Sequence, residues 1–216
     1  MSISITIIII IITAAISFLA FNNHELMDKL IFYPPDIAQR KQWYRFFSNG
    51  LIHADIGHLA FNMISLYFFG DFVNRAFSSP ILFGRSGNLL YLIMYVSALA
   101  VCLIPTYMSN KENYYYRSLG ASGAVSAVIF AGILLDPANK LYMFFIPIGI
   151  PGFIFGPLYL IISAYLSKKG TSHINHSAHI WGALYGIAFL IVMCYALRTG
   201  FNPFDNFVQS VQSFKL

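Results

Sequence analysis

The chain has 216 residues, of which 58% are hydrophobic and only 10% are charged. A soluble domain carries about 25% charged residues, so this composition excludes a surface that faces water on all sides and indicates an integral membrane protein. The net charge of +5 is modest, and the scattered basic residues favour contact with lipid headgroups over nucleic-acid binding. Cys102 and Cys194 both lie in apolar runs, which indicates neither a disulfide nor a zinc framework.

Apolar runs along the chain predict six membrane-spanning helices, since a hydrocarbon core requires about 20 apolar residues per helix and fewer where a helix is buried among others. We expect an all-α, polytopic bundle in which residues 1–216 form a single domain. The first run lacks the basic start and the small-residue cleavage site of a signal peptide, so it is interpreted as a retained span. The predicted spans are residues 3–21, 57–77, 89–108, 119–136, 152–167 and 177–197.

The long loop between the first two predicted spans has the composition of a membrane-interface segment. Aromatic rings and basic side chains occur together in it, a combination that suits a helix lying in the interface plane. A plain surface helix is the alternative interpretation. The residues concerned are Trp43, Tyr44, Phe46 and Phe47 beside Arg40, Lys41 and Arg45.

A serine lies between glycines where a tyrosine-rich polar loop becomes the fourth predicted span. Gly120 and Gly123 flank Ser122 and let the backbone approach a neighbour or a substrate closely. The start of a helix also offers free N–H groups that suit a developing oxyanion. Many serines in membrane helices only bond their own backbone, which we expect of Ser65, Ser97, Ser126 and Ser163.

A histidine at the start of the sixth predicted span supplies a partner for that serine. Gly182 and Gly186 follow His179 at helical spacing, so the imidazole and a small-residue seam share one face. Close packing on the serine helix would bring Ser122 and His179 together, and a neutral histidine can take the serine proton. No carboxylate lies at a place in a predicted span where it could orient the imidazole, so the pattern indicates a dyad.

The second predicted span opens with two further hydrogen-bond donors. His58 and Asn62 are four residues apart, so both project from one helix face, as an oxyanion hole requires. A structural pair that bridges helices is the alternative.

Two other protease chemistries fit the chain poorly. His173, His176 and His179 follow one another at intervals of three residues. Since a helical turn has 3.6 residues, each step rotates the side chain around the helix, and the first and third histidines are poorly placed for one metal ion. The H-E-x-x-H pattern of zinc proteases is absent. These two observations disfavour a metal site, and no cofactor is expected. Asp71 and Asp136 lie at span ends, which disfavours an aspartyl protease.

The segment from Phe144 to Pro157 contains three prolines and three glycines. We expect its first part to turn in the membrane interface and the following helix to be short and loosely held. A loosely held helix beside the site would provide an entrance for substrate from the lipid. An ordinary proline-kinked span is the alternative.

Together these motifs closely resemble those of the rhomboid intramembrane serine proteases in their basic six-helix form. The matching patterns are H-x-x-x-N at His58 and Asn62, G-x-S-G at Gly120–Gly123, and A-H followed by G-x-x-x-G from Ala178 to Gly186. The resemblance implies Ser122 as nucleophile, His179 as base, and His58, Asn62 and the Ser122 N–H as the oxyanion hole.

The resemblance also gives His53 and Arg45 roles in shaping the cavity and the interfacial loop. The chain departs from the family at Ser126, where many members carry an aromatic residue packed on the histidine, and at Asn49, where some carry another histidine. The departure at Ser126 leaves the orientation of His179 without an explanation.

We therefore predict an intramembrane serine endopeptidase that cleaves single-span membrane proteins in the lipid bilayer. The alternatives are a catalytically inactive rhomboid-like factor that binds membrane proteins, and a small transporter, which the lack of repeat symmetry disfavours. The compact form and the absence of an organelle-type leader favour the bacterial inner membrane. Family topology puts both termini in the cytoplasm, whereas the count of basic loop residues disfavours that orientation.

Overall fold

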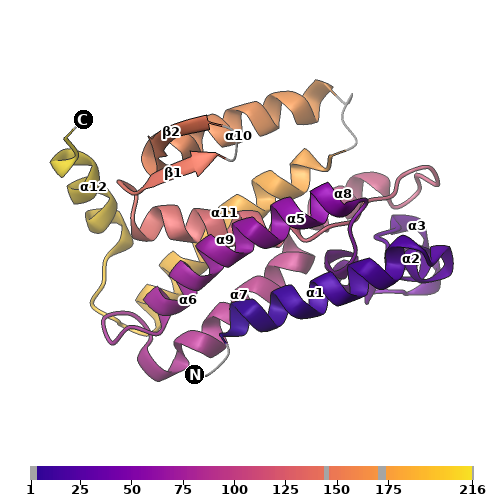
Figure 1. Ribbon diagram of the computed structural model, residues 1–216, viewed down its shortest axis with the longest axis horizontal. Helices are drawn as coiled ribbons and strands as arrows, with labels where there is room; N and C mark the ends of the chain where they lie inside the picture. The colour runs from indigo at the N-terminus through magenta and orange to yellow at the C-terminus, as the bar shows by residue number, and fades with distance from the viewer. Residues whose placement is uncertain (1–3, 144–145, 170–173, 216) are drawn as a thin grey trace.

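The computed structural model describes residues 4–143, 146–169 and 174–215, and these are mostly helical (Figure 1). A π-helical turn at Leu66–Gly70 joins α5 to α6, and short 3-10 turns occur at Asn49–Leu51 and Gly84–Ser86. The elements are α1 (Ile5–Phe21), α2 (His24–Leu30), α3 (Pro34–Arg40), α4 (Arg45–Ser48), α5 (Ile56–Ser65), α6 (Asp71–Phe77), α7 (Gly87–Val101), α8 (Ile104–Asn110), α9 (Ser122–Leu135), β1 (Lys140–Met143), β2 (Ile146–Pro151), α10 (Gly152–Lys169), α11 (His176–Ala196) and α12 (Pro203–Ser213).

Three helical stretches of the described chain are long and apolar enough to cross a membrane. They are Ile56–Phe77, Gly84–Asn110 and His176–Ala196, while Ile5–Phe21 and Ser122–Leu135 are apolar but shorter. The predicted spans all fall on helical segments, but 57–77 covers α5 and α6 with the turn between them, and 89–108 covers α7 and most of α8. Helix α10 runs from residue 152 to residue 169, close to the predicted 152–167. Membrane character and a mainly helical fold are thus confirmed.

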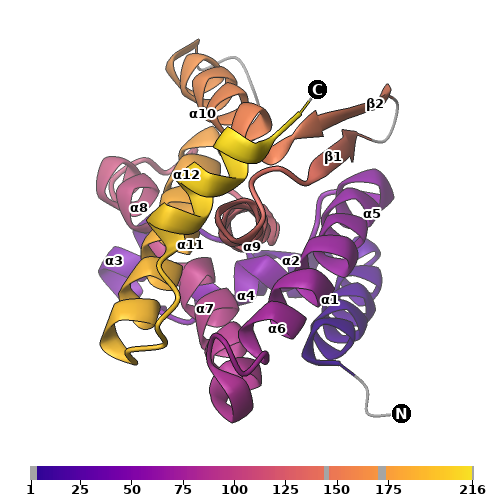
Figure 2. The same ribbon diagram turned by 90° about the vertical axis from the view of Figure 1, so that its left-hand side faces the viewer.

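Helix α9 lies at the centre of the bundle, with α11, α7, α6, α10 and α12 arranged around it (Figure 2). Its small residues let several neighbours approach, and nearly all of its side chains are buried. At 14 residues it extends only about 21 Å. The helix is therefore shorter than a hydrocarbon core of about 30 Å.

The predicted small-residue seam is where α11 meets α9. A Cβ atom added at Gly182 would overlap the carbonyl oxygen of Gly123, and one at Gly186 would overlap that of Ala127. Only glycine permits this approach of the two backbones, because a carbonyl group within a helix cannot rotate away.

The first loop is more structured than the sequence indicates, because α2, α3 and α4 gather around one buried guanidinium group. Arg45 is 5% exposed and donates hydrogen bonds to the carbonyl oxygens of Asp28 and Ile31. It also pairs with Asp36 at 3.5 Å. These contacts agree with the expected role of Arg45 in shaping the interfacial loop, and Trp43 and Tyr44 are exposed as an interface segment requires.

A strand pair that was not predicted precedes α10, and α10 itself is longer than expected. The β1–β2 hairpin occupies part of the proline-rich segment, with Leu141 opposite Ile150. Helix α10 then begins directly after Pro151 and is long, although we expected a short one. Pro157 lies inside α10, in its second turn, so it removes one hydrogen bond of the helix, the bond to the carbonyl oxygen of Phe153. The expected turn at residues 144–145 falls outside the described residues.

Helix α12 caps the end of α9 through a side chain. Asn206 donates hydrogen bonds to the carbonyl oxygens of Leu134 and Leu135, which have no partner within α9. Phe214, directly after α12, packs edge-on against Phe153 of α10. These contacts tie the last helix to the central one.

The close contact of α9 and α11 predicts a stability difference between two glycine substitutions. Gly186→Ala is expected to cost about 1–3 kcal/mol by overpacking against backbone, which lowers the unfolding midpoint in detergent by roughly 3–10 °C. Gly156→Ala on α10 is the control, because its new Cβ would lie 3.4 Å from Phe130, an ordinary contact. Equal midpoints for the two variants, read by near-UV circular dichroism, would contradict this account of the seam.

Candidate active site

The first turns of α9 and α11 bring the predicted nucleophile and base together. The Nε2 atom of His179 lies 2.7 Å from the Oγ atom of Ser122, within hydrogen-bond distance. Both side chains are half-buried. The two residues are 57 positions apart, so their contact depends on the Gly182 and Gly186 seam described above.

The start of α11 is fixed by a side-chain cap. Asn175 accepts a hydrogen bond from the backbone N–H of Ala178 at 3.1 Å, which satisfies one free donor of the first turn. Thr106 of α8 in turn donates to Asn175 at 3.2 Å. His179 therefore projects from a helix end that is anchored to a neighbouring helix.

The backbone before Ser122 is held by the first loop at successive residues. Phe32 and Ser118 exchange two backbone hydrogen bonds, and the N–H of Gly120 donates to the carbonyl oxygen of Asn49 at 2.9 Å. Gly120 has a φ of +111°, a conformation that side chains with a Cβ rarely adopt. This glycine is thus required by backbone geometry at the turn into α9.

His53 ties the same turn to α1. The hydroxyl of Ser17 donates to the carbonyl oxygen of Leu51 at 2.9 Å, so its oxygen is left to accept from Nδ1 of His53 at 3.0 Å. The other ring nitrogen, Nε2, must then be the acceptor, and the N–H of Ala121 points to it at 3.5 Å. His53 is fully buried, and through Ala121 it supports the backbone of the site.

His58 lies beside the turn that carries Ser122, while Asn62 is engaged within its own helix. A Cβ atom at Gly120 would be 2.9 Å from Nε2 of His58, so the imidazole lies directly over this glycine. Asp55 caps α5 by accepting from the N–H of His58. The amide of Asn62 donates to the carbonyl oxygen of His58 at 3.0 Å, which leaves its second N–H for another acceptor.

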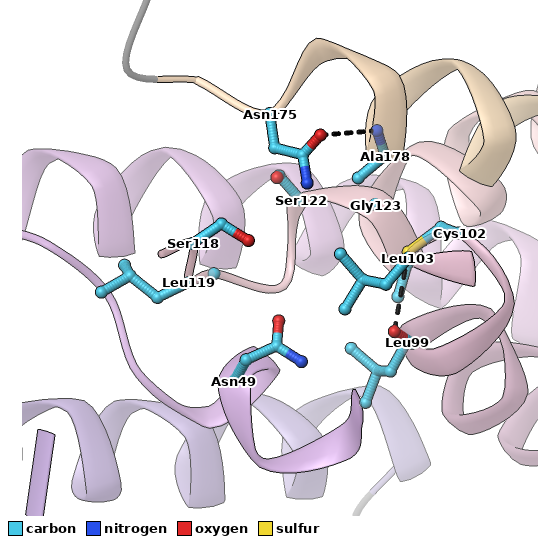
Figure 3. Close-up of a pocket in the computed structure, with 12 residues that line it drawn as sticks. Asn49, Leu99, Cys102, Leu103, Ser118, Leu119, Ser122, Gly123, Asn175 and Ala178 are labelled. Atoms are coloured by element: carbon cyan, nitrogen blue, oxygen red, sulfur yellow. Dashed lines mark hydrogen bonds between the residues drawn. The ribbon is translucent and has the colours of Figure 1, made fainter. Parts of the chain in front are cut away.

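A small cavity lies next to Ser122, between the starts of α9 and α11, the end of α7 and the first loop (Figure 3). Its volume is about 10 Å³, about the room of one water molecule. It is lined by Asn49, Leu99, Cys102, Leu103, Ser118, Leu119, Gly120, Ser122, Gly123, Ala124, Asn175 and Ala178. A second cavity of about 380 Å³ between α8, α10 and α11 includes His176, one helical turn before His179.

One residue of the site escaped the sequence analysis. The ring of Tyr159 on α10 stacks beside the imidazole of His179, with centroids 6.3 Å apart and planes at 23°. Its hydroxyl lies 3.0 Å from Oγ of Ser126. Ser126 was expected to bond its own backbone, as Ser97 does with Ile93. That expectation is wrong for Ser126, because a partner hydroxyl from α10 is within reach.

Residues 40–196 match the family model of the rhomboid domain. The chain belongs to the rhomboid family. This family includes serine intramembrane proteases as well as rhomboid-like proteins. The match covers α4 to α11 and leaves α12 outside.

Several relatives are between 27% and 32% identical to this rhomboid over the part that aligns. RHOMBOID-like protein 12, mitochondrial, of Arabidopsis thaliana is 32% identical over 76% of the chain and 50% of its own length. Rhomboid protease GlpG of Haemophilus influenzae is 27% identical over 73% of each chain. Presenilin-associated rhomboid-like protein, mitochondrial, of Bos taurus is 30% identical over 64% of the chain and 35% of its own length. The chain thus spans half or less of the length of the two mitochondrial relatives.

Burial makes His53 a source of acid sensitivity. Desolvation, with a smaller effect of the neighbouring His58, lowers the pKa of His53 to about 3. The unfolded chain binds this proton near pH 6.5, so the folded state loses stability as the pH falls from about 6.5 toward 3, by up to about 1.4 kcal/mol per unit. His53→Gln, which does not titrate, should flatten this dependence of the unfolding midpoint. His24→Gln, on the exposed start of α2, is the control, and an unchanged slope in His53→Gln would refute the assignment.

Proposed function

We propose that this protein is an intramembrane serine endopeptidase that uses a Ser122–His179 dyad. The observation that carries the proposal is the 2.7 Å approach of the imidazole Nε2 to the serine Oγ. A half-buried hydroxyl beside an unprotonated ring nitrogen is the arrangement that nucleophilic catalysis requires. Rhomboid membership supports the same chemistry, since relatives such as GlpG are named rhomboid proteases.

The reaction follows from these positions. Oγ of Ser122 attacks the substrate carbonyl carbon while Nε2 of His179 takes the hydroxyl proton. The imidazole then gives this proton to the leaving amine, and an acyl-enzyme is left on the serine. A water molecule repeats the attack with the same base and releases the new carboxyl terminus. The cavity beside Ser122 has room for about one such water.

The negative charge of the tetrahedral intermediate needs donors on the other side of the serine. We assign this role to the imidazole of His58, the free N–H of Asn62 and the backbone N–H of Ser122 at the start of α9. His58 lies over Gly120, two residues before the nucleophile, which supports its part in the site. Gly120, Gly123, Gly182 and Gly186 let these groups approach, and His53 supports the turn.

We further propose six membrane spans in one domain, with the α2–α4 loop in the membrane interface. The short α9 would hold Ser122 below the membrane surface, near one end of the longer helices. Single-span membrane proteins are the proposed substrates, because a transmembrane helix can reach this depth from the lipid side. The bacterial plasma membrane is the proposed location, and the mitochondrial names of two relatives make an organelle membrane the competing one.

Labelling with a fluorophosphonate tests the dyad, because only an activated serine forms the phosphonyl adduct. The purified protein in detergent should be labelled at Ser122 and should cleave a model single-span substrate in liposomes. Ser122→Ala and His179→Asn should each lower both signals by at least about 1,000-fold. Ser213→Ala is the control, since this exposed serine at the end of α12 bonds its own helix and should keep full activity.

Two results would overturn the proposal. Full cleavage by either dyad variant would remove the assigned roles. A folded wild-type protein that binds single-span proteins but neither reacts nor cleaves would support an inactive rhomboid-like binding factor.

Removal of an oxyanion donor should act on turnover. His58→Ala is expected to lower kcat by about 100- to 1,000-fold with little change in KM, because the lost hydrogen bond forms only in the transition state. His24→Ala on the exposed part of α2 should leave both constants unchanged. A raised KM with an unchanged kcat would instead make His58 a substrate-binding residue.

A further inference from the structure

The geometry points to Tyr159 of α10 as a positioning residue for His179, so that the orientation of the base depends on where α10 lies. This inference rests on the proposed dyad. The sequence offers no aromatic residue on α9 beside the histidine, since position 126 is a serine. The ring of Tyr159, at 6.3 Å and 23° to the imidazole, occupies that place from a different helix.

The hydroxyl of Tyr159 fixes this ring against the helix that carries the nucleophile. It lies 3.0 Å from Oγ of Ser126, and Ser126 is only 2% exposed. Ser126 follows Ser122 by four residues, so both project from the same face of α9. One tyrosine thus contacts the base with its ring and the nucleophile's helix with its hydroxyl. A larger residue at position 126 would take the space that this contact requires.

Helix α10 is held to the bundle by few side chains. It lies at the edge of the molecule in both views (Figures 1 and 2), and among its residues only Gly152, Gly156 and Ser163 are buried. Ile161 and Tyr165 are each 64% exposed. On the side that faces the site, Tyr159 packs on Phe155 of the same helix and on Phe130 of α9. The contact of Tyr159 with α9 and His179 is therefore one of the main attachments of this helix.

A displacement of α10 from α9 would remove both contacts at once. The imidazole of His179 would lose the ring on one side and gain rotational freedom, while the seam between α9 and α11 would stay closed. The dyad would then be correctly aligned only when α10 is seated on α9. A substrate that enters beside α10 must let the helix return before the serine is activated.

The test compares variants of Tyr159 by the rate of fluorophosphonate labelling of Ser122 and by kcat and KM for a model single-span substrate. Tyr159→Phe keeps the ring and should slow labelling about 2- to 10-fold, as should Ser126→Ala. Tyr159→Leu loses ring and hydroxyl and should slow it about 10- to 100-fold, with kcat lowered and KM unchanged. Tyr159→Phe combined with Ser126→Ala should be no slower than either alone, because both remove one hydrogen bond.

A transplanted ring separates positioning from general packing. Ser126→Tyr combined with Tyr159→Leu places the ring on α9 and should recover labelling to within about fivefold of wild type, since the imidazole regains its neighbour. Tyr165→Leu, an exposed tyrosine of the same helix, should behave as wild type. Unfolding midpoints measured for all variants identify any that fail to fold, and Tyr159→Phe, which keeps the shape of the side chain, remains informative in that case.

The outcomes distinguish this inference from the proposed function. Wild-type labelling together with an unchanged rate in Tyr159→Leu would overturn the role of Tyr159 and leave the dyad intact. Equal losses in Tyr159→Leu and Tyr165→Leu would also overturn it. A wild-type protein that folds but does not label would refute the dyad itself.

Discussion

The contact between the backbones of α9 and α11 is the constraint on which the candidate site depends. Gly182 meets the carbonyl group of Gly123, and Gly186 meets that of Ala127, with no side chain between them. Two helices in this contact cannot slide or separate without opening voids, because the lipid offers no alternative packing of comparable density. The distance between Ser122 and His179 is therefore set by glycines one and two turns away from the reacting atoms.

A second group of contacts, outside α9, fixes the conformation of the residues that precede Ser122. The first loop holds residues 118–121 through the bridge from Phe32, the carbonyl oxygen of Asn49 and the ring of His53. That loop is itself built around the buried guanidinium group of Arg45. The direction in which Ser122 projects is thus determined by a segment about 70–90 positions earlier in the chain. This coupling accounts for a loop with so many short helices.

The parts of the fold and the site that sequence patterns predicted are those with a local physical signature. Apolar runs located the six helical segments, and glycines at helical spacing located the seam. The bond of Ser17 to His53 and the ring of Tyr159 depend on helix placement, which no spacing along the chain encodes. The cap at Asn175 is local and could have been predicted from an asparagine directly before an apolar helix. The hairpin was missed because the prolines and glycines of the segment from Phe144 to Pro157 favoured an irregular turn, and α12 was missed because its residues do not form an apolar run.

The position of Tyr159 shows why the missing aromatic residue at 126 does not leave the base unsupported. A histidine without a partner carboxylate is oriented by the groups that pack against it, and any helix that reaches it can supply them. A ring on α9 would move with the nucleophile and keep the base aligned at all times. A ring on α10, a helix with few buried residues at the edge of the bundle, makes alignment conditional on that helix. At the proposed site, this condition would suppress reaction while a substrate enters beside α10, since the seam holds Ser122 and His179 together but does not fix the plane of the imidazole.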